Sequence, residues 1–263
     1  MNIGVLQFGS VIGDVTANVA TAERRAREAA ARAADVLLLP EAWNTGFLPD
    51  DLSVAEVSRS GPASEMMQGV ARDRRVNVVG GSLVVREGGR AFNRTFVFDR
   101  SGAQVATYDK THLFSPMGED ERITPGGATC RFDLDGVPCG CLICYDLRFP
   151  EIARALAFAG AELLFVAAQW PQSRIDVWRA LLRARAIENT AFLAACNGCG
   201  NGPHGPVGGH SMVVNPRGDV LWQAENGEET GLVEINSGDV AAMRADFPAF
   251  REGRERYGAR YTP

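Results

Sequence analysis

The chain of 263 residues is predicted to fold as one α/β domain, in which two mixed β-sheets pack between outer layers of helices. Three observations lead to this prediction. Apolar runs of strand length alternate with helical patterns from one end of the chain to the other. Hairpin turns join some strands and helices connect others, so parallel and antiparallel pairing must coexist. Finally, no Pro-, Ser- or Gly-rich linker divides residues 1–263, so a single domain is expected.

The N-terminal part of the chain alternates strands and helices. Ile3–Phe8 is a short apolar strand, and a helix is expected over Thr16–Ala33, capped by its first residue. The segment DVLLLP at 35–40 is a continuous apolar run, which is typical of a strand covered on both faces. Proline suits the first turn of a helix, so a second helix is predicted over Pro62–Arg74.

A strand-rich segment follows this second helix. Strands are expected over Val76–Val85, Ala91–Asp99 and Gln104–Asp109, because the turn sequences EGGR and RSG separate them. Residues 110–128 are irregular and rich in charge, glycine and proline. A loop of this length inside a compact domain is usually functional.

The second half of the chain repeats the alternation. Two helices are predicted, over Pro150–Ala159 and Arg174–Glu188. The predicted strands are Val137–Ile143, Glu162–Ala167, Ala191–Cys196, Val207–Asn215, Asp219–Ala224 and Thr230–Ile235. A short helix and a polar, arginine-rich tail of about 245–263 end the chain.

Composition and charge exclude several classes of function. The formal net charge of −5 leaves no basic surface of the kind that nucleic-acid binding requires. No segment approaches the ~20 apolar residues of a membrane span. The N-terminus MNIGVLQFGS lacks the basic region and the long apolar run of a signal peptide. A cytoplasmic protein is therefore expected, in which the six cysteines are reduced thiols.

Cys144 stands where the apolar strand GCLIC ends and the chain turns toward a helix through YDLRFPE. Such a turn presents a side chain at the end of a sheet and aims backbone N–H groups at a developing negative charge. Position alone leaves two interpretations open, a catalytic nucleophile or a buried core thiol.

Two ionisable residues also follow apolar strands. Glu41 comes after LLLP beside Trp43 and Phe47, whose apolar rings limit hydration, and desolvation raises a carboxyl pKa toward neutrality. Lys110 ends a strand in YDKTHLF and can stabilise an oxyanion or a nearby thiolate. Taken singly, each has an ordinary alternative, a capping glutamate or an exposed lysine. Because Glu41, Lys110 and Cys144 all end strands, we expect them along one sheet edge, where α/β proteins bind ligands.

The segments LLLPEAWNTGF, YDKTHLF and GCLICYDLRFPE resemble, in this order, the three motifs of the nitrilase or carbon–nitrogen hydrolase superfamily. The similarity extends from the first strand to NPRGDVLW and covers most of the chain. One such motif is weak evidence, whereas three in order are specific. The resemblance implies an α-β-β-α sandwich, and the hydrolysis of a non-peptide C–N bond of a small amide without a cofactor.

The resemblance also implies roles for the site residues. Glu41 would be the general base and Cys144 the nucleophile that forms a thioester. Lys110 and the backbone N–H of Tyr145 would stabilise the oxyanion. Many amidases of the superfamily place a second glutamate in the pocket, and Glu119 in GEDERITPG aligns with it. A solvated loop charge is the alternative for this residue.

The residues beside the nucleophile indicate which branch of the superfamily the chain resembles. Nitrilases carry Cys-Trp-Glu there, whereas this chain carries Cys-Tyr-Asp, which resembles the amidases. The stretch AAQWPQSRIDVWRALLRARAIENTAFLAACN resembles bacterial omega-amidases, which deamidate 2-oxoglutaramate and related 2-oxo acid amides. Arg174 is a candidate partner of a substrate carboxylate. A cation near a helix N-terminus opposes the helix dipole, so a compensating anion is expected beside it. An ordinary surface arginine is the alternative. Phe47, Tyr145 and Trp170 complete the expected substrate-binding set.

Several alternatives remain open. N-carbamoyl amino acid hydrolysis and nitrile hydrolysis are the nearest enzymatic ones, and a non-catalytic small-molecule binder on the same fold is the other. No metal ligand is assigned: the CxxC pairs ending at Cys144 and Cys199 lie much farther apart than the about 15–20 residues of zinc arrays. Some relatives carry an arginine where this chain reads CNGCGNGPHG, which leaves the substrate open.

A homodimer is implied by the resemblance. Members of the superfamily usually pair through their outer helices, and a C-terminal tail reaches the partner. The tail of this chain, about 245–263, is too polar to form its own core but carries aromatic anchors. These anchors are Phe247, Phe250, Tyr257 and Tyr261.

Overall fold

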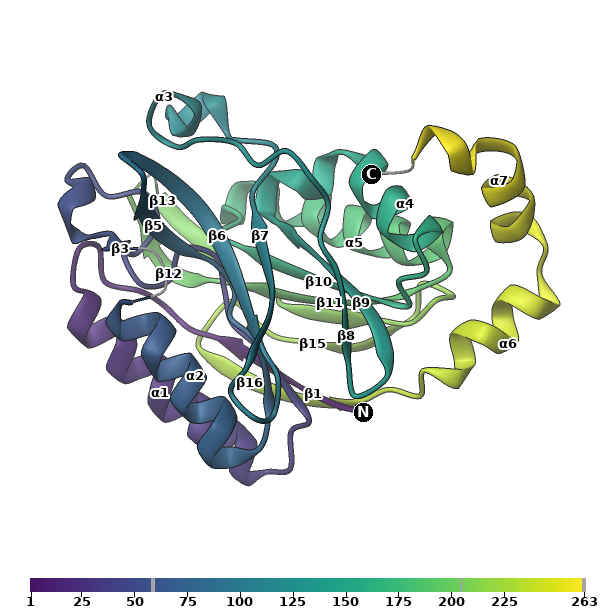
Figure 1. Ribbon diagram of the computed structural model, residues 1–263, viewed down its shortest axis with the longest axis horizontal. Helices are drawn as coiled ribbons and strands as arrows, with labels where there is room; N and C mark the ends of the chain where they lie inside the picture. The colour runs from purple at the N-terminus through teal and green to yellow at the C-terminus, as the bar shows by residue number, and fades with distance from the viewer. Residues whose placement is uncertain (58–59, 204, 262–263) are drawn as a thin grey trace.

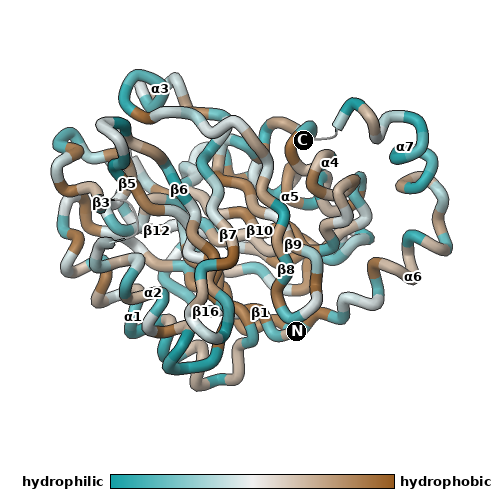
Figure 2. Tube along the Cα trace, in the orientation of Figure 1, coloured by the Kyte–Doolittle hydropathy of each residue, from teal (hydrophilic) through white to brown (hydrophobic). Residues whose placement is uncertain are grey.

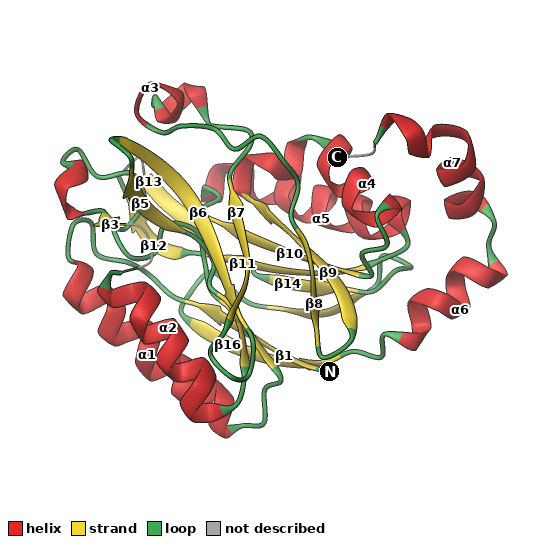
Figure 3. Cartoon of the chain, in the orientation of Figure 1, coloured by secondary structure: helices red, strands yellow, loops and turns green. Residues whose placement is uncertain are grey.

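The computed structural model describes residues 1–57, 60–203 and 205–261 (Figure 1). Two large sheets lie face to face, and helices cover the outer face of each (Figure 3). This arrangement confirms the predicted α-β-β-α sandwich. The last two residues of the predicted tail, 262–263, lie outside the described part of the chain.

The larger sheet has the strand order β16-β1-β2-β4-β6-β5-β3, and β7 pairs with β6. Pairing is mixed, since β1, β2 and β4 run parallel whereas β16 and β6 are antiparallel to their neighbours. The strands are β1 (Asn2–Gln7), β2 (Val36–Leu38), β3 (Glu56–Val57), β4 (Asn77–Val79), β5 (Leu83–Glu87), β6 (Arg90–Phe98), β7 (Gln104–Asp109) and β16 (Glu229–Glu234).

The smaller sheet has the strand order β15-β14-β11-β10-β9-β8, and its centre is parallel. Strands β10 and β11 at this centre are buried along their whole length and, except for Asn197 at the end of β11, apolar, because both of their faces are covered. The strands are β8 (Arg131–Leu134), β9 (Val137–Ile143), β10 (Leu163–Ala168), β11 (Phe192–Asn197), β14 (Met212–Val214) and β15 (Val220–Gln223). A separate two-stranded hairpin consists of β12 (Cys199–Gly202) and β13 (Gly205–Gly208).

The helices form the two outer layers. Helices α1 (Val15–Ala31) and α2 (Pro62–Arg74) pack on the larger sheet, and α4 (Pro150–Phe158) and α5 (Ile175–Asn189) pack on the smaller one. In α1 the buried alanines recur at helical spacing, which gives the helix a narrow apolar face. The remaining helices are α3 (Glu119–Arg122), α6 (Gly238–Asp246) and α7 (Ala249–Tyr257), and the last two project from the sandwich in Figure 1.

The main core lies between the two sheets, where the strands are the most apolar part of the trace (Figure 2). Side chains from the inner faces of both sheets interdigitate there and are fully buried. Those of the larger sheet include Ile3, Val5, Val36 and Leu38, and those of the smaller sheet include Ile143, Leu163, Phe165 and Phe192. Burying each large apolar side chain of this layer stabilises the fold by about 1.5–3 kcal/mol.

The strand predicted over Val76–Val85 is divided into β4 and β5, and this break shapes the site. Gly81 has φ +63°, and a Cβ atom there would lie 2.0 Å from the carbonyl oxygen of Pro40. Only glycine fits this approach. The bend carries the chain past the segment that follows β2, where the Ser82 hydroxyl accepts a hydrogen bond from the N–H of Ala42 at 2.9 Å.

Other predicted boundaries also differ. Asp14, not Thr16, caps α1, because its Oδ1 accepts the N–H of Ala17 at 3.0 Å. The predicted strand Val207–Asn215 is interrupted by Gly209, whose φ is +60°. Strand β8 and the β12–β13 hairpin were not predicted. The polar tail contains α7, which docks by placing the ring of Phe250 5.6 Å from that of Phe158.

Candidate active site

Three strand exits meet at one end of the sandwich. Glu41 follows β2 and Lys110 follows β7 in the larger sheet, whereas Cys144 follows β9 in the smaller sheet. The expectation of a single sheet edge is therefore wrong, because the site lies between the two sheets. The backbone N–H of Glu41 donates to the carbonyl oxygen of Ala168, at the end of β10, and joins the sheets there at 3.4 Å.

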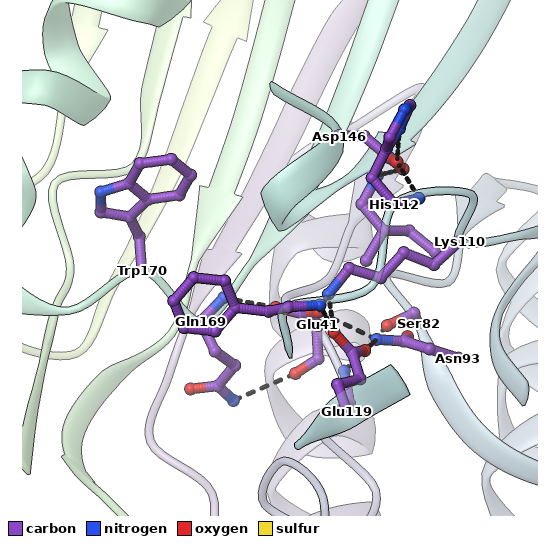
Figure 4. A network of polar contacts seen from close by, with 12 residues as sticks. Glu41, Ser82, Asn93, Lys110, His112, Glu119, Asp146, Gln169 and Trp170 are labelled. Carbon is purple, nitrogen blue, oxygen red and sulfur yellow. Dashed lines mark hydrogen bonds and ion pairs between the residues drawn. The ribbon is translucent and has the colours of Figure 1, made fainter. Parts of the chain in front are cut away.

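Lys110 is buried between two carboxylates. Its Nζ lies 2.8 Å from Oε1 of Glu41 and 2.7 Å from Oε2 of Glu119, and the three side chains are at most 2% exposed. Burial opposes the charge of Lys110, but the charges of both glutamates outweigh it and raise its pKa above the ordinary value. These residues form the buried ion cluster at the centre of Figure 4. The predicted Glu119 is thus part of the site and not a solvated loop charge.

Backbone and amide groups hold the carboxylates of the ion cluster. The side chain of Asn93 donates to Oε1 of Glu41 at 2.9 Å and to Oε1 of Glu119 at 3.0 Å. The backbone N–H of Gln169 donates to Glu41 Oε2 at 2.9 Å, and that of Phe114 donates to Glu119 Oε2 at 2.7 Å. Sequence reasoning missed Asn93 and Gln169. Little in the sequence indicated Asn93, because its strand also carries Arg90, Arg94 and Thr95.

Cys144 begins a tight 3₁₀ turn, Cys144–Arg148, with φ of +46°. A non-glycine residue in this left-handed region stores about 1–3 kcal/mol of strain, which is typical of functional turns. Desolvation raises the pKa of the Cys144 thiol well above its usual value, and the charge of Glu41 adds to this effect. Lys110 lowers the pKa but does not compensate. Burial therefore favours the neutral thiol at Cys144, the predicted nucleophile, and Lys110 alone does not offset this effect.

Asp146 connects this turn to the segment after Lys110. Its carboxylate is fully buried and accepts the Tyr108 hydroxyl at 2.7 Å and the backbone N–H of Ile143 at 3.0 Å. It also accepts the backbone N–H of His112 at 2.9 Å, and the ring Nδ1 of His112 lies 3.0 Å away. The ends of β7 and β9, and with them Lys110 and Cys144, are fixed relative to each other by this one carboxylate.

A small, partly open pocket lies beside Cys144 and Lys110. All four predicted substrate-binding residues line it, namely Phe47, Tyr145, Trp170 and Arg174. Further lining residues are Phe114, Met117, Arg148, Gln169 and Pro171. The two glutamates of the ion cluster are not among the lining residues, but Glu41 interacts directly with the thiol of Cys144, which does line the pocket.

Two arginines on the pocket wall rest on aromatic rings. The guanidinium of Arg148 lies 5.2 Å from the centre of a Trp170 ring, and that of Arg174 lies 5.7 Å from the centre of the Phe114 ring. Among the described residues, neither guanidinium makes an ion pair or a side-chain hydrogen bond. The pocket therefore offers two cations to a ligand.

The CxxC pairs do not form a metal site in the part of the chain that the structure describes. No group of three or more His, Cys, Asp or Glu residues is placed there to hold a metal ion. The thiol of Cys141 interacts with that of Cys130. Within the same described ranges, no helix is long and apolar enough to span a bilayer.

Comparisons with known proteins identify the family. The carbon–nitrogen hydrolase family profile matches residues 2–245. A 2-oxoglutaramate amidase of Bacillus subtilis (strain 168) is 39% identical, over 96% of this chain and 97% of that protein. The structure of a carbon–nitrogen hydrolase superfamily protein from Xanthomonas campestris, with an arsenic adduct in the active site, has a TM-score of 0.90 at 30% identity and covers 96% and 97% of the two chains. A mutant amidase from Nesterenkonia sp. AN1, with acrylamide added to the active-site cysteine, has a TM-score of 0.83 at 29% identity and covers 94% and 97%. The chain belongs to the carbon–nitrogen hydrolase family.

Proposed function

We propose that this carbon–nitrogen hydrolase is an omega-amidase, which releases ammonia from 2-oxo acid amides such as 2-oxoglutaramate. The observation that carries the proposal is the pair of guanidiniums, Arg148 and Arg174, that face the pocket of Cys144 without an acidic partner among the described residues. Guanidinium groups bind carboxylates through paired hydrogen bonds. The similarity to a 2-oxoglutaramate amidase supports the same substrate class.

In the proposed acylation, the thiol of Cys144 attacks the amide carbonyl while Glu41 accepts its proton. A base is needed because the pKa of this thiol is raised by burial. Negative charge then develops on the carbonyl oxygen. An ammonium group has three hydrogens, and Lys110 directs two of them to Glu41 and Glu119, so the third is available to this oxyanion together with the N–H of Tyr145.

Ammonia leaves when Glu41 returns the proton to the amide nitrogen, and a thioester remains on Cys144. Glu41 then deprotonates a water molecule, which attacks the thioester and releases the carboxylic acid and the Cys144 thiol. Glu119 takes part by holding Lys110, to which it lies 2.7 Å away. Loss of one oxyanion donor typically raises the barrier by about 2.7–4 kcal/mol.

Ammonia release from a substrate panel tests the reaction. The panel contains 2-oxoglutaramate, glutamine, asparagine, an N-carbamoyl amino acid and a nitrile, and Cys144→Ala is the control. We expect turnover of the 2-oxo acid amide that the control lacks. Preference for the carbamoyl compound or the nitrile would replace the proposal by one of those activities. Failure with every compound, together with unselective labelling of Cys144 by iodoacetamide, would favour a non-catalytic binder.

Arg174→Ala and Arg148→Ala test the substrate class. Hydrogen bonds to charged groups are worth about 1.5–3 kcal/mol, so each variant should raise KM for 2-oxoglutaramate by about 10- to 150-fold. The KM of a neutral amide such as butyramide should stay unchanged. Arg179→Ala, in helix α5 that begins directly after Arg174, is the matched control because Arg179 pairs with Asp176. An unchanged KM for the anionic amide in both variants would exclude the carboxylate contact.

We further propose that the enzyme is a cytoplasmic homodimer. All six cysteines are free thiols, which suits a reducing compartment. A cleft between the helices of the smaller sheet and α7 is lined by aromatic residues, and Phe247 and Tyr257 are 60% and 47% exposed. A partner that covers these rings would remove exposed apolar surface. Sedimentation should give twice the chain mass of 28.3 kDa, and Phe247→Asp should shift the mass toward that of one chain.

A further inference from the structure

Asn93 lies within β6 and points into the ion cluster of Glu41, Lys110 and Glu119 (Figure 4). The residue is 3% exposed. Its backbone carbonyl accepts the N–H of Lys110 at 2.9 Å. Both its main chain and its side chain therefore contact the cluster.

The amide group of Asn93 bridges the same carboxylates as Lys110. Its Nδ2 donates to Oε1 of Glu41 at 2.9 Å and to Oε1 of Glu119 at 3.0 Å. An amide nitrogen has two hydrogens, so both are used on carboxylates. Each glutamate is consequently held by an ammonium and by an amide, which leaves its carboxylate little freedom to rotate.

The amide oxygen of Asn93 indicates that the site uses only the N–H donors of this side chain. Oδ1 of Asn93 is buried and has no hydrogen-bond partner among the described residues. An unsatisfied buried acceptor costs free energy, so the two N–H donors, which both serve buried carboxylates, are what Asn93 contributes here. Asparagine also donates without adding a second positive charge, which would compete with Lys110 for the carboxylates.

We propose that Asn93 is a positioning residue for the hydrolysis: it orients Glu41 to accept the Cys144 proton and holds Glu119 against Lys110. The inference rests on the proposed function, in which Glu41 is the base. Asn93 touches neither the substrate pocket nor the thiol, so its effect passes through the two glutamates.

Asn93→Asp tests this role, because it keeps the shape but replaces both donors by an acceptor. The groups that face the new carboxyl are Glu41, Glu119 and Lys110, with the Cys144 thiol beyond Glu41. Three carboxyl groups around one ammonium favour uptake of a proton. We expect kcat to fall about 100-fold at neutral pH with KM within about 3-fold, because misplacement of a reacting group affects the chemical step. The acid limb of the pH profile should move up by about one pH unit.

Asn77→Asp is the matched control. Asn77 lies on β4 of the same sheet, is 1% exposed, and likewise donates to a carboxylate, Oδ2 of Asp135 at 2.8 Å. It sits at the far end of the strand, away from the cluster. Both variants should lose comparable thermal stability, but only Asn93→Asp should change kcat and the pH profile. Equal pH profiles in both variants would overturn the proposal and leave Asn93 a structural residue.

Alkylation of Cys144 by iodoacetamide, followed by peptide mass spectrometry, separates this inference from the proposed function. The reaction needs no substrate, but the raised pKa of the thiol makes it depend on proton removal. We expect Asn93→Asp to slow labelling at neutral pH by about 10-fold or more relative to Asn77→Asp. An unchanged rate would refute the positioning role, even in an enzyme that hydrolyses amides. An enzyme inactive on every amide but with slower labelling in Asn93→Asp would refute only the function.

Discussion

Lys110→Met removes the ammonium that separates the buried carboxylates of Glu41 and Glu119 while roughly preserving the side-chain volume. In the wild type both oxygens lie within 2.8 Å of Nζ, and the three side chains are at most 2% exposed. Removing one partner of a buried ion pair destabilises a protein by about 3–5 kcal/mol. For a chain of this size, 1 kcal/mol corresponds to about 2–4 °C in Tm. The variant should therefore unfold roughly 6–20 °C lower near neutral pH.

The loss of stability caused by Lys110→Met should depend on pH in a definite direction. The pKa of Lys110 is raised in the folded protein, so its stabilisation persists until the pH rises through that high value. In the variant the two carboxylates repel each other, and one of them takes up a proton in the folded state. The folded state then binds more protons than the unfolded state, so stability falls as the pH rises.

Thermal unfolding at pH 5 and pH 8 measures this effect. We expect the difference in Tm between the wild type and Lys110→Met to be larger at pH 8 by several degrees. Lys110→Arg, which keeps a positive charge in the cluster, should show little of this pH dependence even if its fit is poorer. The same difference in Tm at both pH values for Lys110→Met would refute the reasoning that Lys110 offsets the repulsion between the two carboxyl groups.

Two further substitutions test the backbone and the turn. Gly81→Ala places a Cβ atom 2.0 Å from the Pro40 carbonyl oxygen and should lower Tm far more than Gly88→Ala does. Gly88 also has a positive φ but open space around it, so its substitution costs only about 1–2 kcal/mol of left-handed strain. Equal Tm values for the two variants would contradict the close approach at Gly81. Asp146→Asn turns an amide donor toward the donors of Tyr108 and Ile143, so the free energy of unfolding should fall by about 2–3 kcal/mol and amidase activity should decrease. Asp133→Asn is the control: Asp133 is exposed and paired with Arg131, so this variant should change neither stability nor activity.

The strands and helices with strong local patterns were predicted correctly from the sequence. The apolar run before Glu41 and the proline-initiated helices α2 and α4 have the predicted type and nearly the predicted bounds. Strand β8 was missed although Phe132 and Leu134 alternate with exposed residues, because four residues give a weak periodic signal. The β12–β13 hairpin consists largely of glycine and has no apolar pattern, so only backbone pairing defines it.

Strand exits and motifs indicated the candidate site residues, which the structure brings together, but their arrangement across two sheets was not predicted. Nothing in the local sequence tells which of two stacked sheets a strand joins, so Cys144 was expected on the same edge as Glu41. Asn93 lies inside a strand, where periodicity reports only the face it occupies. Its proposed role depends on two carboxylates far away in the chain, which only the folded arrangement brings within hydrogen-bonding distance.

The charges of the cluster explain why the proposed base must work on a thiol rather than a preformed thiolate. Burial raises the pKa of the Cys144 thiol, and the charge of Glu41 adds to this effect, whereas Lys110 lowers it. Proton transfer to Glu41 moves the negative charge to sulfur, and attack moves it to the carbonyl oxygen, so no step adds charge to the buried site. At each stage the charge stays beside Lys110, where a preorganised cation is most effective in a water-poor pocket. Electrostatic stabilisation and proton transfer are therefore two uses of the same three side chains, which is why replacing any one of them should impair both acylation and deacylation.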